Sequence, residues 1–254
     1  MPRPSLRGRA HRAATPLLGG VLLVSAALLV WYGFGAAGSA EIWPVLATRR
    51  ELLIESAGVT LLEAAYGLVA GAALAIVAAW AAGAADGARG PLQLLMLICY
   101  AVPLVALGPL LTSSVEREAI PVIAAAISVA LPVFSAAEAG LGTIPQGLRD
   151  LLAVHGAGRW RRLRLVEAAG TLPHVVEGVK FAVPGALLGA LIGEWFGSER
   201  GLGVLLVSGL REGQDDLVAT VSVLVVAVSS IVYAVFARLA RTVHRRRGTT
   251  GSVA

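Results

Sequence analysis

Six long apolar runs constrain the fold of this chain more than any other feature of the sequence. They cover residues 16–34, 58–82, 91–112, 120–137, 176–196 and 217–237. A helix needs roughly 20 apolar residues to cross the hydrocarbon core of a membrane. The runs therefore predict an all-α polytopic membrane bundle of about six transmembrane helices. Composition agrees, because 15% of the 254 residues are charged, against about 25% in soluble domains.

Two apolar segments need separate interpretation. The piece 202–210 is too short to cross a membrane, so it predicts a short re-entrant or surface helix. The first run follows several arginines and precedes Gly38-Ser39-Ala40, which also suits a cleavable signal peptide. Its apolar stretch is close to 20 residues, longer than the usual 7–15 of a signal peptide. We therefore expect this first helix to be retained.

Basic residues are distributed unevenly among the connections between the runs. If the N-terminus is cytoplasmic, 16 of the 21 Lys and Arg residues lie inside and five lie outside. The positive-inside rule favours this orientation, with both termini in the cytoplasm of a multi-pass inner-membrane protein. We expect a basic N-terminus at 1–15, a transmembrane domain at 16–237 and a basic tail at 238–254. The tails suit anionic lipid headgroups, and nothing in the sequence predicts nucleic-acid binding.

The sequence lacks the signatures of common catalytic sites. A Walker P-loop needs Gly-Lys-Ser/Thr, but the single lysine, Lys180, lies between Val179 and Phe181. The four histidines fall outside the apolar runs, and no CxxC, HExxH or carboxylate cluster predicts a metal. We therefore expect no catalytic residue, cofactor or metal, which leaves transport, signalling or scaffolding.

The connection 141–173 is long for a link between membrane helices. An apolar stripe at i, i+3, i+4 spacing predicts a short amphipathic helix in it, formed by Leu148, Leu151 and Leu152. Gly156 and Gly158 then permit a sharp turn, and a second short helix follows among arginines. The pattern predicts either a projecting helix pair or a helix pair that lies on lipid headgroups.

This connection resembles the cytoplasmic loop of the permease subunits of binding-protein-dependent ABC importers. That family carries E-A-A-x-x-x-G, followed some ten residues later by I-x-L-P. The matching register is DLLAVHG, with Asp150 for the glutamate and Gly156 for the glycine, followed by VEAAGTLP at 166–173. Leu151 and Leu152 replace the alanines, and Ala169 replaces the first proline of V-E-L-P-A-A-L-P. The literal EAA at 167–169 has no glycine at the right distance.

The resemblance extends over residues 60–237. GEWFGSERGLG at 193–203 looks like the end of the fifth helix in the branch that handles sulfonates, taurine, nitrate, pyrimidine precursors and riboflavin. TLLEAAYGLVAG at 60–71 looks like the second helix of that branch, and PLVALGPLL at 103–111 resembles its third. The aromatic-rich ending usual in that third helix is missing.

The resemblance implies a type I ABC importer permease that acts with several partners. A second copy or a homologous permease would complete the route, and two ATP-binding subunits would hydrolyse ATP. An extracytoplasmic solute-binding protein would deliver an organic sulfonate, a nitrate-like anion or a pyrimidine- or riboflavin-type precursor. The residues implied in ATPase coupling are Asp150, Leu151, Leu152, His155, Gly156, Ala157 and Trp160.

Small and charged residues inside the runs are further candidates. Glycines at four-residue spacing favour close helix packing, or else a wall of the pathway: Gly67 and Gly71, then Gly185, Gly189 and Gly193. Glu63 and Glu194 are costly in lipid, so we regard them as pathway or gate candidates. Glu194 could instead make a structural hydrogen bond near the outer surface. Trp195 is a third gate candidate, or else part of the aromatic belt.

Two other functions compete with the importer. An ion-coupled secondary transporter would show inverted repeats and paired charges at the membrane midplane, and the sequence shows neither. A membrane scaffold would need no pathway at all. Only the importer predicts that an ATPase subunit co-purifies with this chain.

Overall fold

The computed structural model describes residues 42–84, 87–156, 158–162 and 166–248. Within these ranges every regular element is a helix, and the predicted all-α membrane bundle is confirmed. Four helices are long and apolar enough to cross a membrane: α3 (Arg50–Ala84), α6 (Ile120–Gly142), α9 (Ala168–Gly197) and α11 (Asp215–Gly248). The first predicted run, 16–34, lies outside the described residues.

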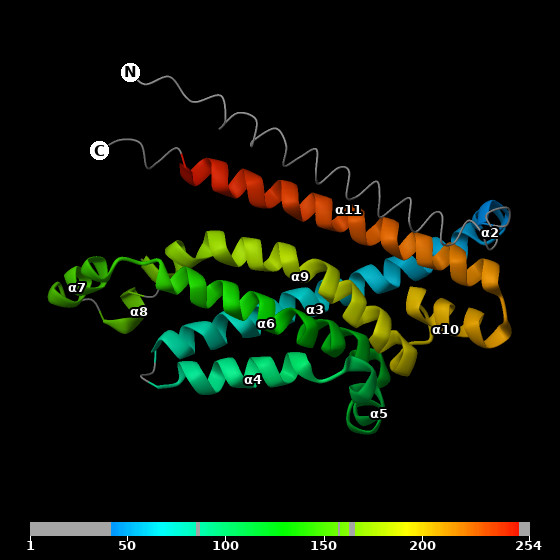
Figure 1. Ribbon diagram of the computed structural model, residues 1–254, viewed down its shortest axis with the longest axis horizontal. Coiled ribbons are helices and arrows are strands. Elements are labelled where there is room, and N and C mark those ends of the chain that lie inside the picture. The colour runs from blue at the N-terminus through cyan, green and yellow to red at the C-terminus, as the bar shows by residue number, and fades with distance from the viewer. Residues whose placement is uncertain (1–41, 85–86, 157, 163–165, 249–254) are drawn as a thin grey trace, which may run out of the picture. The chain divides into compact units, whose positions relative to one another are not determined.

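Three of these helices, α3, α6 and α9, form the core. Figure 1 shows them running lengthwise together, and α6 packs most extensively against both of its neighbours. The shared core is built largely from small side chains, among them Ala75, Ala79, Ala125 and Ala190, with Phe134 filling the space between them. Small residues let helix backbones approach closely. In a membrane the hydrophobic effect does not drive helices together, so the van der Waals contacts of this close packing stabilise the bundle.

Several helices extend beyond the apolar runs. α3 has 35 residues, or about 52 Å of helix, against roughly 30 Å of hydrocarbon core. α9 begins at Ala168, inside the predicted loop, and α11 continues to Gly248, so that much of the predicted basic tail is helical. These helices therefore continue beyond the apolar runs, into residues that do not need an apolar surface facing lipid.

The predicted run 91–112 is divided in two. α4 (Arg89–Ala101) and α5 (Leu104–Ser114) meet at a 95° bend. Pro103 has no N–H to donate to the carbonyl of Cys99, and a residue before proline is forced out of the helical region. Val102 accordingly has an extended backbone, with φ −68° and ψ 125°. The pair is one broken span or a re-entrant segment.

Short helices occupy the connections. A 3₁₀ turn, η1 (Arg117–Ala119), leads into α6, and α10 (Leu202–Glu212) precedes α11. α10 is the short, non-spanning helix that the sequence predicts at 202–210. α2 (Ile42–Thr48) belongs to a separate unit of the chain and is described only by itself, with the Arg49 N–H donating to the Val45 carbonyl.

Candidate coupling helices and translocation site

Two short helices, α7 (Gln146–Val154) and α8 (Arg159–Arg162), lie between α6 and α9. Figure 1 shows them beyond the ends of α6 and α9. Gly156 has φ +68°, a left-handed conformation that favours glycine. Just after the end of α7, the N–H of His155 donates to the Leu151 carbonyl at 3.1 Å, and its Nδ1 lies 2.8 Å from the same oxygen. The structure thus has the helix pair and the turn that the spacing predicts.

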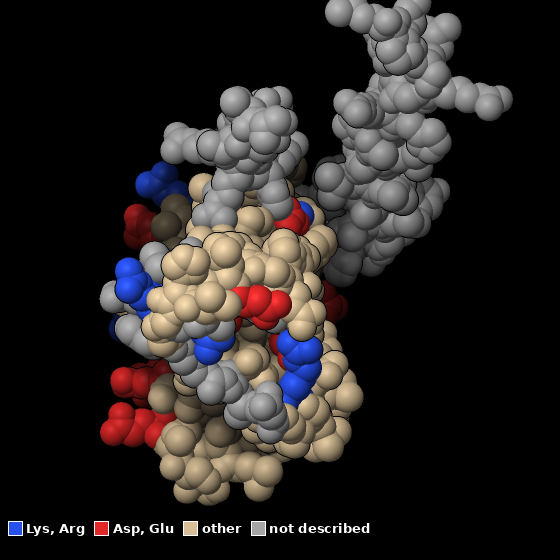
Figure 2. Space-filling view, turned by 90° about the vertical axis from the view of Figure 1, so that its left-hand side faces the viewer, with Lys and Arg blue, Asp and Glu red and all other residues tan. Residues whose placement is uncertain are grey.

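α7 presents apolar side chains to the outside. Leu151 is 55% exposed and Val154 is 84% exposed, while Leu152 is half-buried. Asp150 is exposed on the same helix. Figure 2 looks onto this end of the bundle and shows charged side chains of both signs around a largely uncharged surface. Exposed aliphatic side chains on a helix outside the membrane core suit contact with a partner.

The remaining loop candidates are less completely placed. Trp160 belongs to the backbone of α8, and Ala157 lies outside the described residues. Arg161 is exposed beside Trp160 in the chain. At the same end of the bundle, Arg89 at the start of α4 forms an ion pair with Glu138 of α6, with Nε and Oε1 3.1 Å apart.

The glycines of α3 lie where this helix is closest to α6. A Cβ at Gly67 would lie 2.8 Å from the Val122 carbonyl oxygen, and one at Gly71 would lie 2.9 Å from the Ala126 Cα. Neither position has room for a side chain. Close contact between these backbones therefore requires glycine.

The glycines of α9 approach α6 from its other side. A Cβ at Gly189 would lie 2.7 Å from the Ala124 carbonyl oxygen, and one at Gly193 would lie 2.9 Å from the Pro121 nitrogen. Gly185 differs, because a Cβ there would meet the Ser128 carbonyl oxygen at an ordinary 3.5 Å. α6 is thus held between two glycine-lined helices.

Glu194 is buried near the end of α9, with 1% of its surface exposed. Its Oε2 accepts a hydrogen bond from the Gly203 N–H at 2.5 Å, and Oγ1 of Thr60 accepts one from the Leu202 N–H at 2.9 Å. The first N–H groups of a helix have no intrahelical acceptor, and a carboxylate interacts favourably with that end of the helix dipole. Side chains of α9 and α3 therefore cap the N-terminus of α10.

Glu63 and Trp195 border a hollow near the C-terminal end of α9, the end of that helix farther from α7 and α8. The hollow has a volume of about 560 Å³, and its other lining residues include Arg117, Glu118 and Arg200. Oε1 of Glu63 accepts a hydrogen bond from the Ser198 hydroxyl at 3.0 Å, and Trp195 is 40% exposed. The gate candidates share one end of the bundle, with Glu194 buried and the other two at a polar surface.

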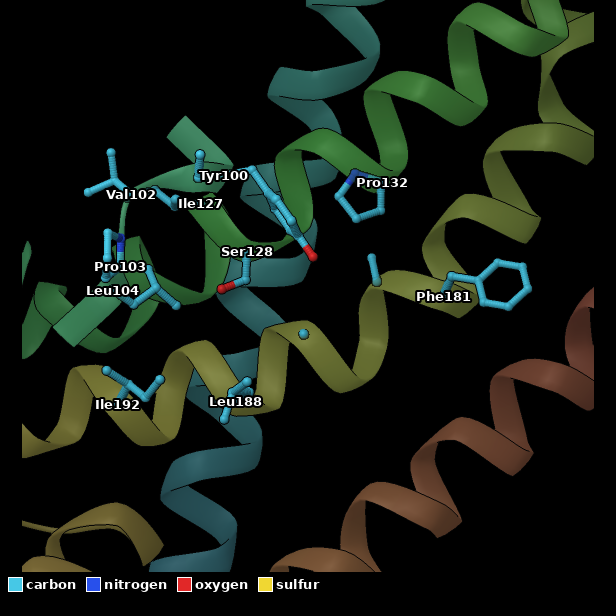
Figure 3. Close-up of a pocket in the computed structure, with 13 residues that line it drawn as sticks. Tyr100, Val102, Pro103, Leu104, Ile127, Ser128, Pro132, Phe181, Leu188 and Ile192 are labelled. Carbon is cyan, nitrogen blue, oxygen red and sulfur yellow. The ribbon is translucent and has the colours of Figure 1, made fainter. Parts of the chain in front are cut away.

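A second cavity, of about 430 Å³, lies at the break between α4 and α5 (Figure 3). Its walls come from residues 100–104 of the break, from α6 through Ser128 and Pro132, and from α9 through Phe181 and Leu188. Of the earlier candidates it contains only Gly185. Sequence reasoning missed this cavity, because Val102-Pro103 inside an apolar run permits a break but does not require one.

Comparison with known proteins decides the family. The family model for the binding-protein-dependent transport system inner membrane component matches residues 67–248. The chain belongs to this family. The resemblance seen in the sequence is therefore confirmed, and neither an ion-coupled transporter nor a scaffold is favoured.

Individual relatives agree with this permease family. A probable ABC transporter permease protein of Haemophilus influenzae is 30% identical over 227 residues, 85% of this chain and 93% of that protein. The riboflavin transport system permease protein RibX of Chloroflexus aurantiacus is 34% identical over 114 residues, 42% of this chain and 40% of its own length. The MetNI methionine ABC transporter, solved in inward-facing conformations, shares the fold with a TM-score of 0.61 at 19% identity, covering 79% of this chain and 98% of that chain.

Membership of the permease family defines the role of this chain in transport. An ABC importer permease is a multi-pass protein of the inner membrane and not an enzyme, since ATP hydrolysis takes place on a partner subunit. The family implies ATP-binding subunits and a substrate-binding protein as partners. In the described ranges, no group of three or more His, Cys, Asp or Glu residues could hold a metal ion.

Proposed function

We propose that this permease moves a small solute into the cytoplasm, as one of a pair with a second copy or a homologous permease. The candidate solutes are an organic sulfonate, a nitrate-like anion and a pyrimidine- or riboflavin-type precursor. Partial similarity to RibX supports the last class, as does 26% identity over 114 residues, 43% of this chain and 44% of the relative, to the formylaminopyrimidine transport permease protein ThiX of Halalkalibacterium halodurans.

The single observation that carries the coupling role is the exposed apolar face of α7 beside the Gly156 turn. Leu151 and Val154 would insert into a groove of an ATP-binding subunit, with one such subunit docked on each permease of the pair. Arg161 would lie at the rim, where charge steers association more than it adds affinity. Closure of the ATP-binding subunits would then move α6 and α9, which the two short helices connect.

The orientation follows from the same assignment. α7 and α8 would face the cytoplasm together with both termini, in agreement with the excess of basic residues on that side. The opposite end, with Glu63 and Trp195, would face the solute-binding protein. Glu194 would act there through α10, whose N-terminus it caps, so that α3, α9 and α10 move as one part of the outer gate.

Purification of the tagged chain from its native membrane in mild detergent tests this function. We expect an ATP-binding subunit to co-purify, and the reconstituted complex to accumulate, only with ATP present, the solute that its binding protein carries. Accumulation driven by an ion gradient without ATP, or a preparation free of any ATP-binding subunit, would contradict the proposal.

A further inference from the structure

If α4 and α5 form one broken span, the cavity at their break lies within the depth of the membrane. α4 has 13 residues, so the break is about 20 Å along a span that must cross roughly 30 Å of hydrocarbon. Irregular backbone at this depth is tolerated only where it is buried in protein or lines a water-filled cavity. Residues 100–104 line the 430 Å³ cavity, so the second condition applies to them.

The break supplies a backbone hydrogen-bond donor to this cavity. Leu104 lines the cavity and is the first residue of α5. Its N–H has no acceptor within the helix, because the first N–H groups of a helix have no preceding turn to bond. The N-terminal ends of half-helices at such breaks face substrate groups in other transporters.

The side chains add apolar walls and two hydroxyl groups. Tyr100 extends from the break toward α6 and α9, and Phe181 and Leu188 come from α9 (Figure 3). The Ser128 hydroxyl donates to the Ala124 carbonyl at 2.9 Å, so its remaining lone pair can accept from a ligand. The Tyr100 hydroxyl can donate or accept. An aromatic side chain such as Tyr100 among apolar residues, with a few placed polar groups, is typical of small-molecule sites, and 430 Å³ is within their usual range.

The candidate solutes differ in charge, and the cavity suits the neutral ones. The residues that line the cavity include no Lys, Arg, His, Asp or Glu in the part of the chain that the structure describes. Burying a sulfonate or nitrate without a cation is costly in a region of low dielectric constant. A neutral ring incurs no such cost, and its flat faces pack against aromatic side chains.

We propose that this cavity is the intramembrane solute site and that it selects uncharged planar heterocycles with neighbouring carbonyl and ring N–H groups. The carbonyl of such a ring accepts from the N–H of Leu104 or from the Tyr100 hydroxyl, and its N–H donates to the Ser128 hydroxyl oxygen. This inference rests on the proposed function and narrows its solute to the pyrimidine- and riboflavin-type class.

Two substitutions alter the cavity, and a third is their control. Gly185→Leu fills the cavity from α9, at a position where a Cβ makes only ordinary contacts. Tyr100→Ala removes the aromatic wall and its hydroxyl. The control, Gly58→Leu, is the same glycine-to-leucine substitution on α3, where a Cβ would meet nothing within 4 Å.

The experiment measures riboflavin binding by fluorescence quenching to the permease–ATPase complex in lipid nanodiscs, with the binding protein omitted. Wild type and Gly58→Leu should bind equally, while Gly185→Leu and Tyr100→Ala should each bind at least tenfold more weakly. Uracil, an uncharged ring with neighbouring carbonyl and ring N–H groups, should displace riboflavin, and taurine at the same concentration should not. Equal binding by all four proteins, no binding by wild type, or displacement by taurine would overturn the proposal.

The result can be separated from the proposed function. If the nanodiscs retain the ATP-binding subunit and hydrolyse ATP while riboflavin binding fails, only the site assignment is wrong. If no ATP-binding subunit is retained, the proposed function itself fails.

Discussion

Glu194 shows how an ionisable residue in a membrane helix can hold structure together. Its carboxylate is buried and accepts from the Gly203 N–H, so the group has a partner within the protein. Such a contact connects α9 to α10, two elements on which the outer gate is expected to depend. The N-terminus of α10 therefore gives one oxygen of this carboxyl group a partner within the protein.

Loss of this cap should destabilise the protein. Glu194→Ala leaves a buried N–H without its acceptor, which costs about 1–3 kcal/mol, whereas Glu194→Gln keeps an oxygen in place and should cost less. The melting temperature in detergent should fall most for the alanine variant. Glu55→Ala is the control, because the Glu55–Arg200 ion pair, 2.6 Å long, is exposed and contributes little. An unchanged melting temperature for Glu194→Ala would refute the capping role.

Two glycines on one helix should respond differently to the same substitution. Gly189→Ala places a methyl group against the α6 backbone, and overpacking of this kind costs about 1–3 kcal/mol. Gly185→Ala makes only ordinary contacts and should be nearly neutral. Size-exclusion profiles and melting temperatures of the two variants test the difference. Equal stability would mean that α6 and α9 do not require a close approach at Gly189.

At the scale of the element, proline acts differently along the chain. Pro132 and Pro184 lie within the continuous helices α6 and α9, whereas Pro103 marks a 95° bend. Pro103→Ala restores an N–H at position 103 and should favour a straight α4–α5 helix, which would close the cavity. We expect uptake to fall at least tenfold with normal membrane insertion, while Pro184→Ala keeps most activity. Normal uptake in Pro103→Ala proteoliposomes would show that the break is dispensable.

Sequence patterns predicted these elements to different degrees. The apolar runs were sufficient to predict α3, α6, α9 and α11, because a membrane imposes a length and a composition on each span. The i, i+3, i+4 leucines and Gly156 were sufficient for α7 and its turn, since both are local features. The bend at Pro103 was not predictable, because neighbouring helices decide whether a proline is tolerated within a helix or breaks it.

Contacts between distant segments also could not be predicted from the sequence. Thr60 and Leu202 are 142 residues apart, and their hydrogen bond exists only because α3 and α10 pack together. Glu194 was recognisable as a costly charge, but its partner was not. The cavity likewise combines the break with α6 and α9, and no local pattern relates Tyr100 to Ser128 or Phe181.

At the scale of the whole molecule, the two ends of the bundle carry different parts of the proposed cycle. α7 and α8 would receive the motion of an ATP-binding subunit, and the capped α10 with the hollow at Glu63 would respond at the outer end. α6 and α9 connect the two ends and pack closely through the glycines of α9. α7 would therefore be the point where ATP hydrolysis is coupled to the spans.

The most direct test changes α7 and measures how much ATP-binding subunit remains with the purified permease, together with ATP-dependent uptake. Leu151→Asp places an unpaired charge in an apolar contact, which costs several kcal/mol when buried, and Arg161→Ala at the rim is the matched control. We predict that Leu151→Asp loses most of the bound ATP-binding subunit and at least tenfold in uptake, with an unchanged melting temperature of the permease, while Arg161→Ala stays within twofold of wild type. Wild-type subunit ratio and uptake in Leu151→Asp would contradict the coupling role of α7.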